Sequence, residues 1–536
     1  MRRIAYRFLA AISPARVGTG VLARPSRAKL GSCLQLQQNS IRYALLGAAL
    51  ATSVITFMIA TATAATRPHY GGTLRVMLQS APDTLELSSN TANATPADYW
   101  DMARTLSLVG DTLVKLDARG DPQPALAIAW QSDNNARHWL FTLRPGVKFH
   151  DGSAASPAAI AQILSALHSN WSVQASAGSV SIECETPVPS LLAELALPRN
   201  LLLKHDTNHV PIGTGPFLVA QWQPEKLLRL AANEDSWAGR PFVDAVEIEF
   251  GKSFRDQAIA LELDKTDVIE ASPQATGGSQ PHGASSSPSS SSLSLSLPVE
   301  LLALVFSANS KAQDPRLREA LALAIDRKPI QSVLLKGAGE PAASILPNWM
   351  TGYSAVFSAP ANPQRARAVL AEGPRPALNL SYGLAYDPRD PQAQLVAERI
   401  ALNAREVGIT VQVSLSGGED VRLVRVVLPS PDAAASLDEA ARQLGLPPPA
   451  FSTPRGASLD DLYQAEHSLL EGHAVIPLFH LPVSSAASAR VRDWVPSRLG
   501  AWNEVGSSPA DVWLADRPEV LRQDSRAYSF PPAGSR

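Results

Sequence analysis

Three histidines lie near the end of the chain, and imidazole nitrogen is a common ligand of transition metals. His467, His473 and His480 are separated by six and by seven residues, a spacing that does not align them on one turn of a helix. His467 falls in a helix predicted from a Ser-x-x-Asp capping box at residues 458–461. Residues 475–479 are predicted to form a buried strand. We therefore expect surface or structural histidines, with no metal site and no cofactor.

Common catalytic motifs are absent from the sequence, which contains no H-E-x-x-H, C-x-x-C, G-x-S-x-G or G-x-G-x-x-G. A Gly-Lys-Ser sequence at residues 251–253 follows a predicted strand, as a phosphate-binding loop would. Such a loop also needs a glycine at the position where Val246 stands. Cys184 lies beside Glu183 without the basic neighbours that activate a thiol, so we expect a buried structural cysteine. We predict no catalytic residue and a protein that is not an enzyme.

Polar loops after predicted strands could bind a ligand without reacting with it. In open α/β sheets, ligands lie beyond the carboxyl ends of the strands. Strands predicted at 74–78 and 378–382 are followed by polar loops at 80–85 and 385–390. The residues of these loops that we expect to contact a ligand are Pro82, Asp83, Thr84 and Tyr386.

Aromatic residues provide another candidate contact. Trp349 and Tyr353 lie in a Pro/Gly-rich loop at residues 347–353, where a ring can stack on a ligand. The alternative, a ring with no ligand role, fits the sequence equally well. The tryptophans in strand-like or turn contexts are expected to belong mostly to the core: Trp130, Trp139, Trp222 and Trp237.

Periodic patterns predict the elements that position these residues. In the first half, apolar residues alternate as strands at 139–143 and 246–250. Between these strands, Ser156 is expected to cap a helix that has Pro157 in its first position. The buried stripe of this helix is predicted to comprise Ile160, Ile163, Leu164 and Leu167.

The second half contains the clearest strand–helix–strand pattern. Helices are expected to open at Asp314-Pro315 with Leu317, Leu321, Ala324 and Ile325 on one face, and at Asn362-Pro363, ending at Gly373. A helix from Asp390-Pro391, with Leu395 and Ile400, stops at Gly408, and a strand follows at 409–415. A strand before and after a helix forms the unit of a parallel sheet. The two halves therefore predict two α/β lobes, whose facing loops form a cleft suited to a small molecule.

A low-complexity tract separates the two halves. Residues 271–298 are rich in Ser, Gly and Pro, including an unbroken serine run at 289–292. Such a composition cannot bury enough apolar surface to fold, so we predict a flexible loop or linker.

The N-terminal segment is predicted to direct export. Residues 1–42 carry eight basic and no acidic residues, and an uncharged stretch at 43–66 closes in Ala60-Thr61-Ala62-Thr63-Ala64. A basic flank, an apolar centre and a small-residue exit describe a cleaved signal peptide, here residues 1–64. The alternative is an uncleaved membrane anchor, because the uncharged stretch approaches the length that spans a bilayer.

Charge is distributed unevenly along the chain. The formal net charge of the whole chain is −2, and removing residues 1–64 would leave −10. An acidic exported chain disfavours nucleic acid as a partner. It would also retain Cys184 as its single cysteine.

Several motifs together resemble the family 5 extracellular solute-binding proteins of ABC importers, the peptide/nickel-binding class. The segment at 139–153, WLFTLRPGVKFHDGS, is similar to the signature of that family. The other matching segments follow in the family's order: GGTLRV at 71–76, DTLV at 111–114, GTGPF at 213–217, NEDSWAGRP at 233–241 and ALALAIDR at 320–327.

The resemblance implies a two-lobed α/β fold of the periplasmic-binding-protein type, with mixed sheets, flanking helices and a hinge. It implies a first lobe at 67–270 that contains an inserted subdomain at about 90–197, then the Ser-rich tract at 271–298. A second lobe at 299–484 follows, and residues 485–536 return to the first lobe. The resemblance also implies that the turn formed by Gly213, Thr214 and Gly215 contacts the ligand.

The resemblance also implies the function of an importer receptor. Members enclose peptides or other small solutes between their lobes and deliver them to a permease and ATPase complex. We expect this chain to do the same as a monomer in the periplasm. The family places an acid of the last lobe at the ligand's amino terminus, and Asp432 is its nearest counterpart here. Val426 and Val427 replace the aromatic residue and acid that usually precede it, and a plain turn carrying Asp432 is the alternative.

Two classes of function follow from the sequence. The first is a transport receptor for a peptide or similar solute. The second is an exported sensory or chaperone-like binding module, a non-transport homologue or, least of all, a hydrolase on the same scaffold.

Overall fold

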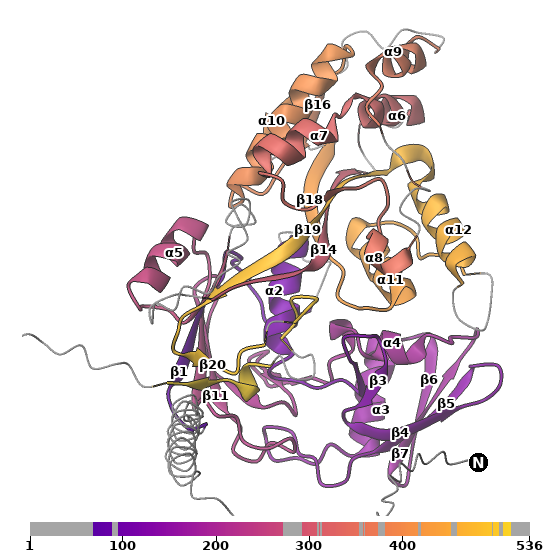
Figure 1. Ribbon diagram of the computed structural model, residues 1–536. Helices are drawn as coiled ribbons and strands as arrows, with labels where there is room; N and C mark the ends of the chain where they lie inside the picture. Colours follow the sequence, from indigo (N-terminus) through magenta and orange to yellow (C-terminus); the bar gives the residue numbers. More distant parts are fainter. Residues whose placement is uncertain are drawn as a thin grey trace, which may run out of the picture. The chain divides into compact units, whose positions relative to one another are not determined.

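A computed structural model describes most of the chain beyond its N-terminal segment (Figure 1). The chain divides into two compact units, Met1–Arg67 and Pro68–Arg536. The first unit, and with it the predicted signal segment, lies outside the described residues. The described residues are 68–87, 95–271, 292–307, 310, 314–352, 357, 360–372, 381–415, 420–451, 458–495, 497–502 and 508–515. Within them, no helix combines the length and the apolar composition needed to cross a membrane.

A mixed sheet runs through both lobes. In spatial order its strands are β10 (Phe217–Gln223), β11 (Leu227–Ala232), β12 (Ala245–Glu249), β1 (Thr73–Met77), β13 (Val268–Glu270), β19 (Val475–Ala487), β14 (Ser292–Phe306), β18 (Val421–Val427), β16 (Ser381–Ala385) and β17 (Thr410–Ser414). β1 pairs in parallel with β12, with Leu74 opposite Val246, and both residues are buried. The strands predicted around 74–78 and 246–250 are confirmed.

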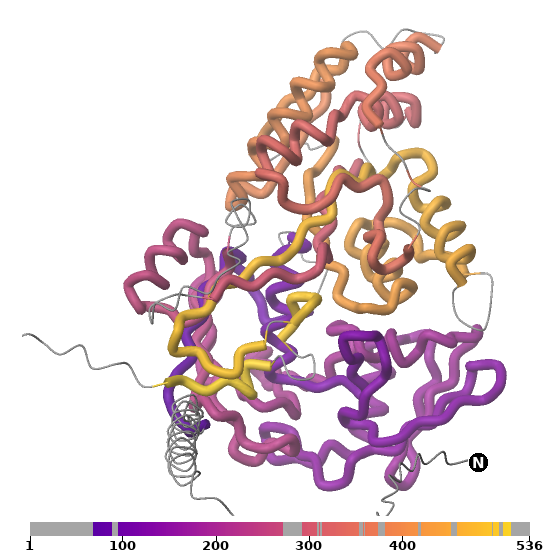
Figure 2. Tube along the Cα trace, in the orientation of Figure 1, coloured from indigo at the N-terminus to yellow at the C-terminus, as the bar shows by residue number. Residues whose placement is uncertain are grey.

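Two long strands connect the lobes. β14 and β19 pair antiparallel along most of their length, and Figure 2 shows their traces running side by side. The register shifts around Pro298, which has no N–H to donate to the ladder. β14 begins at Ser292, so the prediction that the Ser-rich tract extends to residue 298 is wrong. The remainder of the tract, 272–291, lies outside the described residues.

The second lobe buries both faces of its part of the sheet. Successive residues of β14 point to opposite faces, so Leu302 and Leu304 enter one core and Leu301 and Ala303 enter the other. The first core is covered by α6 (Pro315–Ala324), α9 (Pro363–Ala371), α10 (Pro391–Glu406) and the short α7 (Arg327–Pro329). The second is covered by α8 (Asn348–Thr351), α11 (Ala433–Leu444) and α12 (Leu459–Leu470).

The local helix signals of this lobe are confirmed. The side chains of Asp314, Asn362 and Asp390 each accept a hydrogen bond from a backbone N–H in the first turn of the helix that follows. β16 and β17 lie parallel on either side of α10 in the chain, as predicted. Of the two apolar residues named for this helix, Ile400 is buried and Leu395 is 46% exposed. The residues predicted to begin the strand before α10, 378–380, lie outside the described part.

An inserted subdomain has its own core and its own antiparallel sheet. Its strands are β4 (Ala127–Ser132), β5 (His138–Leu143), β7 (Ser179–Cys184) and β6 (Trp171–Ser176), in that spatial order, with α3 (Pro157–Leu167) packed against them. Ser156 caps α3 through Ala159 N. Ile160 and Leu164 are buried, but Leu167 is exposed, so the predicted stripe is one residue too long. Cys184 is buried, as predicted, and burial raises the pKa of its thiol to about 11.

The end of the chain returns to the first lobe. β20 (Val491–Arg492) pairs with β21 (Trp513–Leu514). Trp502, Val512 and Leu514 belong to the same core as Leu74. The remaining short elements are β2 (Val114–Leu116), β3 (Pro122–Pro124), β8 (Lys204–His205), β9 (Pro211–Ile212), β15 (Glu340–Pro341), α2 (Pro96–Leu106), α4 (Leu191–Leu195) and α5 (Phe254–Glu262).

Candidate functional site

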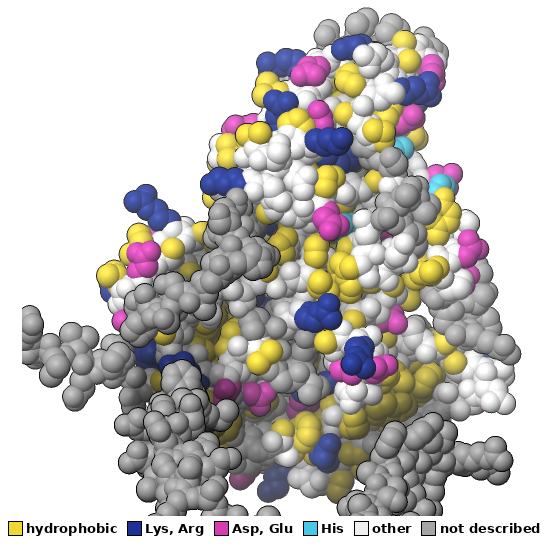
Figure 3. All heavy atoms as spheres, in the orientation of Figure 1, with side chains coloured by type: hydrophobic (Ala, Val, Ile, Leu, Met, Phe, Trp, Pro, Cys, Tyr) yellow, Lys and Arg dark blue, Asp and Glu magenta, His cyan; other side chains and the backbone are white. Residues whose placement is uncertain are grey.

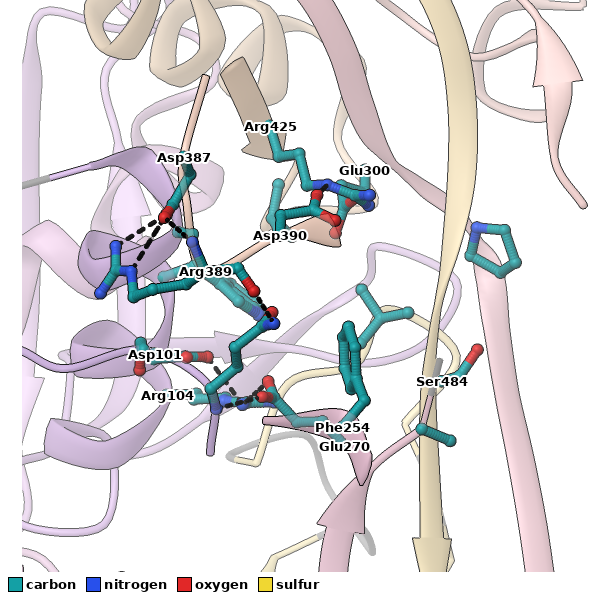
Figure 4. A pocket seen from close by; sticks show the side chains of 18 residues that line it. Asp101, Arg104, Phe254, Glu270, Glu300, Asp387, Arg389, Asp390, Arg425 and Ser484 are labelled. Atoms are coloured by element: carbon teal, nitrogen blue, oxygen red, sulfur yellow. Dashed lines mark hydrogen bonds and ion pairs between the residues drawn. The ribbon is translucent and has the colours of Figure 1, made fainter. Parts of the chain in front are cut away.

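A small cavity of about 100 Å³ lies where the two lobes meet. Its walls come from α2, the ends of β1 and β13, the crossing strands β14 and β19, β18, and the loop that enters α10. Figure 4 shows its charged side chains converging from these elements. The charged residues of its lining are Asp101, Arg104, Glu270, Glu300, Asp387, Arg389, Asp390 and Arg425. Acids outnumber bases in this lining, so the cavity is negative when all of them are ionised.

Arg104 is held on the first lobe by two carboxylates. Its Nη2 lies 2.6 Å from Asp101 Oδ1 and 2.6 Å from Glu270 Oε1. Its guanidinium also stacks over the ring of Trp502, 4.7 Å from the ring centroid. Burial raises the pKa of Asp101 to about 7, against the opposing effect of the Arg104 charge. A proton on Asp101 therefore brings this group of three charges close to neutral near pH 7.

Arg425 makes a corresponding group on the second lobe. Its guanidinium pairs with Glu300 of β14 and, through Nε at 2.7 Å, with Asp390 Oδ2. The other oxygen of Asp390 caps α10 through Gln392 N at 2.9 Å. Burial raises the pKa of Glu300 even though Arg425 opposes the shift. Asp390 thus links the start of a helix to a charge in the cavity wall.

Arg389 joins the two lobes directly. Its Nη1 and Nη2 donate to the two carboxylate oxygens of Asp98 at 2.8 and 3.0 Å, and Nη2 also lies 2.7 Å from Asp387 Oδ2. Although burial opposes ionisation, the hydrogen bonds and the charge of Arg389 hold the pKa of Asp98 below its usual value. The carbonyl oxygen of Arg389 accepts a hydrogen bond from Gln79 Nε2 of the first lobe. Bidentate pairs of this kind restrict geometry as well as adding energy.

A second contact between lobes lies beside the subdomain. Arg199 pairs with Glu194 of its own lobe and with Asp438, at 2.7 Å, and Glu439 of α11. Arg442 of α11 lies over the ring of Tyr99. A wider groove of about 720 Å³ lies alongside, between the subdomain and α11.

Comparison with known proteins identifies the family. The model described as "Bacterial extracellular solute-binding proteins, family 5 Middle" matches residues 121–425, more than half of the chain. The chain belongs to this family. The sequence-based recognition of a family 5 solute-binding protein is therefore confirmed.

Relatives at low identity extend over much of the chain. The probable di/tripeptide-binding protein 5 of Pseudomonas aeruginosa (strain UCBPP-PA14) is 24% identical over 418 residues, which cover 66% of this chain and 75% of that protein. The nickel-binding periplasmic protein of Escherichia coli (strain K12) is 25% identical over 351 residues, which cover 59% of this chain and 66% of that protein.

Solved structures confirm the expected fold. The periplasmic binding protein AgaA from A. tumefaciens R10, in complex with agropinic acid, superposes with a TM-score of 0.70 at 19% identity and covers 83% of this chain and 99% of its own. The oligopeptide-binding protein AppA of Bacillus subtilis, in complex with a nonapeptide, gives 0.68 at 16% identity, covering 84% of this chain and all of its own. The two-lobed α/β fold of periplasmic binding proteins, predicted from the sequence, is confirmed.

Within this family 5 chain, the strand ends predicted as ligand sites lie at the cavity, but the particular residues do not line it. Gln79 and Ser80 line the wall, whereas Pro82 lies just beyond and its carbonyl oxygen accepts a hydrogen bond from Glu225 N. Asp83 is exposed. Thr84 Oγ1 accepts from Glu86 N. On the second lobe, Tyr386 packs against the core, and its neighbours Asp387, Arg389 and Asp390 form the wall.

The Gly-Thr-Gly turn has a structural position, away from the cavity lining. Gly213 and Gly215 lie against the backbone of Val109, where a Cβ on Gly213 would stand 2.1 Å from the Val109 carbonyl oxygen. Thr214 is buried and donates from Oγ1 to Asp111 Oδ2 at 3.0 Å. The turn therefore joins the chain leaving the subdomain to the first lobe.

Trp349 and Asp432 also lie outside the cavity lining. Trp349 belongs to the short helix α8, not to a loop as predicted, and its Nε1 donates to the Pro298 carbonyl oxygen at 2.9 Å. Tyr353 lies outside the described residues. Asp432 is the N-cap of α11 and accepts from Ala435 N at 2.9 Å. This position agrees with the alternative given by the sequence, in which Asp432 belongs to a plain turn.

The three histidines occupy separate environments. His467 lies on α12 beside the ring of Tyr463. His480 is buried in β19, where its Nε2 lies 3.0 Å from the Ile345 carbonyl oxygen. Among the described residues, no group of three or more His, Cys, Asp or Glu side chains is arranged to hold a metal ion.

The charged residues of the cavity carry no catalytic motif. The predicted ligand loop at 385–390 contains Asp387, Arg389 and Asp390. The sequence-based prediction missed the charged residues outside that loop: Asp101, Arg104, Glu270, Glu300 and Arg425. Glu300 stands between Val299 and Leu301, and Arg425 between Val424 and Val426. A charge inside an apolar strand is expensive to bury unless it is paired. A charged residue between apolar strand residues therefore indicates a buried, paired charge, and this pattern could have predicted Glu300 and Arg425.

Proposed function

We propose that the chain captures a peptide or a similar small solute with both amine and carboxylate groups between its two lobes. It then presents the solute to the permease and ATPase complex of an ABC importer. The observation that carries this proposal is the cavity between lobes, whose walls carry acids and arginines from both sides. Relatives named for di/tripeptide and nickel binding support a small-solute receptor, and those with peptides bound support a peptide.

The architecture suits binding by closure. The lobes are joined by the paired strands β14 and β19, whose register shifts beside the cavity at Pro298 and Pro482. Hinged lobes enclose a ligand when a few residues at element ends absorb the change in backbone angles. Binding of this kind needs preformed polar walls and no reacting side chain.

The cleft between the lobes is filled by the protein's own ion pairs. A cavity of about 100 Å³ is smaller than the ~300–1,000 Å³ usual for small-molecule sites. A peptide therefore enters only when the lobes separate and the bridge from Arg389 to Asp98 opens. While no solute is bound, Arg104, Arg389 and Arg425 are each paired with wall acids.

The remaining expectations complete the proposal. The chain acts as a monomer in the periplasm, does no chemistry on its solute, and has no nucleic-acid partner. In support of the last point, basic and acidic side chains are interspersed over the face drawn in Figure 3, and the described residues visible on that face form no continuous basic stripe.

The test combines ligand identification with obstruction of the cavity. Mass spectrometry of protein purified from the periplasm under native conditions is expected to release a peptide or similar solute, and isothermal titration is expected to reproduce its binding. Val427, which lines the cavity, is replaced by Trp to fill it, and the exposed Val333 is replaced by Trp as a control. We expect V427W, checked for folding by its melting curve, to lose binding while V333W retains it. Equal binding by the two variants would place the solute elsewhere and overturn the proposal.

A further inference from the structure

Several buried hydrogen-bond donors without partners belong to residues that line the cavity between lobes. Trp100 Nε1, Arg104 Nε and Ser484 Oγ have no hydrogen-bond partner among the described residues. The three residues are 6%, 5% and 4% exposed, and all of them line the same cavity. Buried polar groups in folded proteins are almost always paired, so an unpaired set at one site needs an explanation.

The chemistry of these atoms defines the missing partner. Indole Nε1–H and guanidinium Nε–H can only donate, and a serine hydroxyl can also donate. The missing partner is therefore an acceptor. Arg104 is a cation, and hydrogen bonds between a cation and an anionic acceptor are the stronger ones. A carboxylate, with two oxygens and no proton to offer, meets these requirements.

The position of the donors separates them from the acids of the opposite wall. Trp100 and Arg104 are four residues apart on α2 and so face the same side of the helix. Ser484 lies on β19 as this strand enters the first lobe. Glu300 and Asp390 lie across the cavity beside Arg425. Asp101 and Glu270 also lie on the donor side, but both already pair with Arg104 Nη2. The atoms of this side that still lack a partner are the donors Trp100 Nε1, Arg104 Nε and Ser484 Oγ.

We propose that Trp100, Arg104 and Ser484 form a subsite for the carboxylate of the bound solute. This proposal rests on the proposed function, because it assigns one end of the solute enclosed by the lobes. The three residues belong to the first lobe and to the strand that enters it, so the subsite exists before the lobes close. The solute docks its carboxylate there first, and the acids of the second lobe then meet its amine.

The test compares the carboxylate with its neutral counterpart. A panel of di- and tripeptides is titrated calorimetrically against the full chain, each as the free acid and as the C-terminal amide. For the peptide that binds best, we expect the amide to bind roughly 10- to 100-fold more weakly. Trp100→Phe and Ser484→Ala each remove one donor and keep most of the shape, so each is expected to shrink that ratio several-fold. Most of this effect should be a weaker binding of the free-acid peptide, with little change in the affinity of the amide.

Matched controls remove the same groups elsewhere. Trp139→Phe deletes an indole N–H that already donates to Ala136 O in the subdomain, and Ser176→Ala deletes an exposed hydroxyl. Both variants are expected to keep the ratio between acid and amide. A folding defect in Trp100→Phe would appear in its melting curve, and Ser484→Ala then supplies the decisive ratio.

The outcomes separate the two proposals. If peptides bind but acid and amide bind equally, the donors are satisfied by water only and the subsite is overturned while the receptor function stands. The subsite is likewise overturned if W100F and S484A leave the ratio unchanged. If no peptide or co-purified solute binds in either form, the proposed function fails and the subsite fails with it.

Discussion

Asp390 shows how one residue can serve two purposes at the cavity. One of its oxygens caps α10 and the other pairs with Arg425. The first role could be predicted from the sequence Asp-Pro, because a cap depends on residues a few positions away. The second could not, because Arg425 lies 35 residues further along the chain and reaches Asp390 only through the sheet. Asp432, which the family resemblance placed at the ligand's amino terminus, is likewise an N-cap, that of α11.

Replacing Asp432 tests that reassignment. We expect Asp432→Ala to lower the free energy of unfolding by about 1 kcal/mol, because α11 loses its N-cap. Asp432→Asn keeps an acceptor for Ala435 N and is expected to retain most of the stability. Both variants should bind the solute with unchanged affinity, measured by titration calorimetry. A loss of affinity in Asp432→Asn without a loss of stability would return Asp432 to the ligand site.

His480 makes the second lobe sensitive to acid. Burial lowers the pKa of His480 to about 4, below the ~6.5 of an unfolded histidine. A group whose folded pKa is lowered contributes stability that is fully present above pH 6.5 and is lost as the pH falls towards 4. His480→Gln should therefore reduce the loss of stability between pH 7 and pH 4 by up to about 3 kcal/mol, as measured by urea unfolding. His205→Gln, at an exposed position on β8, is the control, and an identical effect of both variants would refute the argument.

At the level of elements, the sequence correctly predicted those helix starts that depend on residues close together in the chain. The caps of α3, α6, α9, α10 and α12 were all read from residues next to the helix, and each is present. The start of β14 was missed because serines alternate with Leu293, Leu295 and Leu297, and the serine content suggested a linker. Leu293 and Leu295 are about half exposed. Pairing with β19, not burial, makes this segment a strand.

The turn at 213–215 gives a stability test at this level. In Gly213→Ala the new Cβ would meet the Val109 carbonyl oxygen, so backbone must shift, and we expect a loss of about 3 kcal/mol or more. Gly146→Ala is the control, since nothing lies within 4 Å of its Cβ position and only its left-handed backbone, with φ at +76°, is strained. That strain should cost about 1 kcal/mol. Equal melting temperatures for the two variants would show that the turn does not depend on close backbone packing.

At the level of the whole molecule, the lobes meet through pairs that are remote in sequence. Arg389 and Asp98 are 291 residues apart, and Arg199 and Glu439 are 240 apart. Neither pair has a local pattern, so the sequence could predict a cleft from the two lobes without predicting which charges line it. Family resemblance supplied the arrangement of lobes. The particular wall charges come from residues that are remote in this chain's sequence, such as Glu300 and Arg425.

The bridge from Arg389 to Asp98 should set how far the lobes separate without solute. Removing it by Arg389→Ala takes away the two hydrogen bonds to Asp98 and a longer one to Thr95 Oγ1. We expect the open fraction to rise about tenfold, equivalent to ~1.4 kcal/mol. Energy transfer between dyes on Ile259→Cys and Leu402→Cys, exposed on the two lobes, reports the separation in a Cys33→Ser background. Cys184 is buried and should stay unlabelled.

Three further measurements decide whether this bridge acts between lobes. Asp98→Asn should reproduce the opening, and the double variant should add little, because both changes remove one interaction. Arg365→Ala breaks an exposed pair within the second lobe and should leave the transfer efficiency unchanged. Saturating solute should bring the lobes together again in Arg389→Ala, at a solute concentration no higher than the native chain requires, because the bridge must open before solute can enter and the variant has no bridge to open. An efficiency that does not change in Arg389→Ala would show that packing alone holds the lobes together.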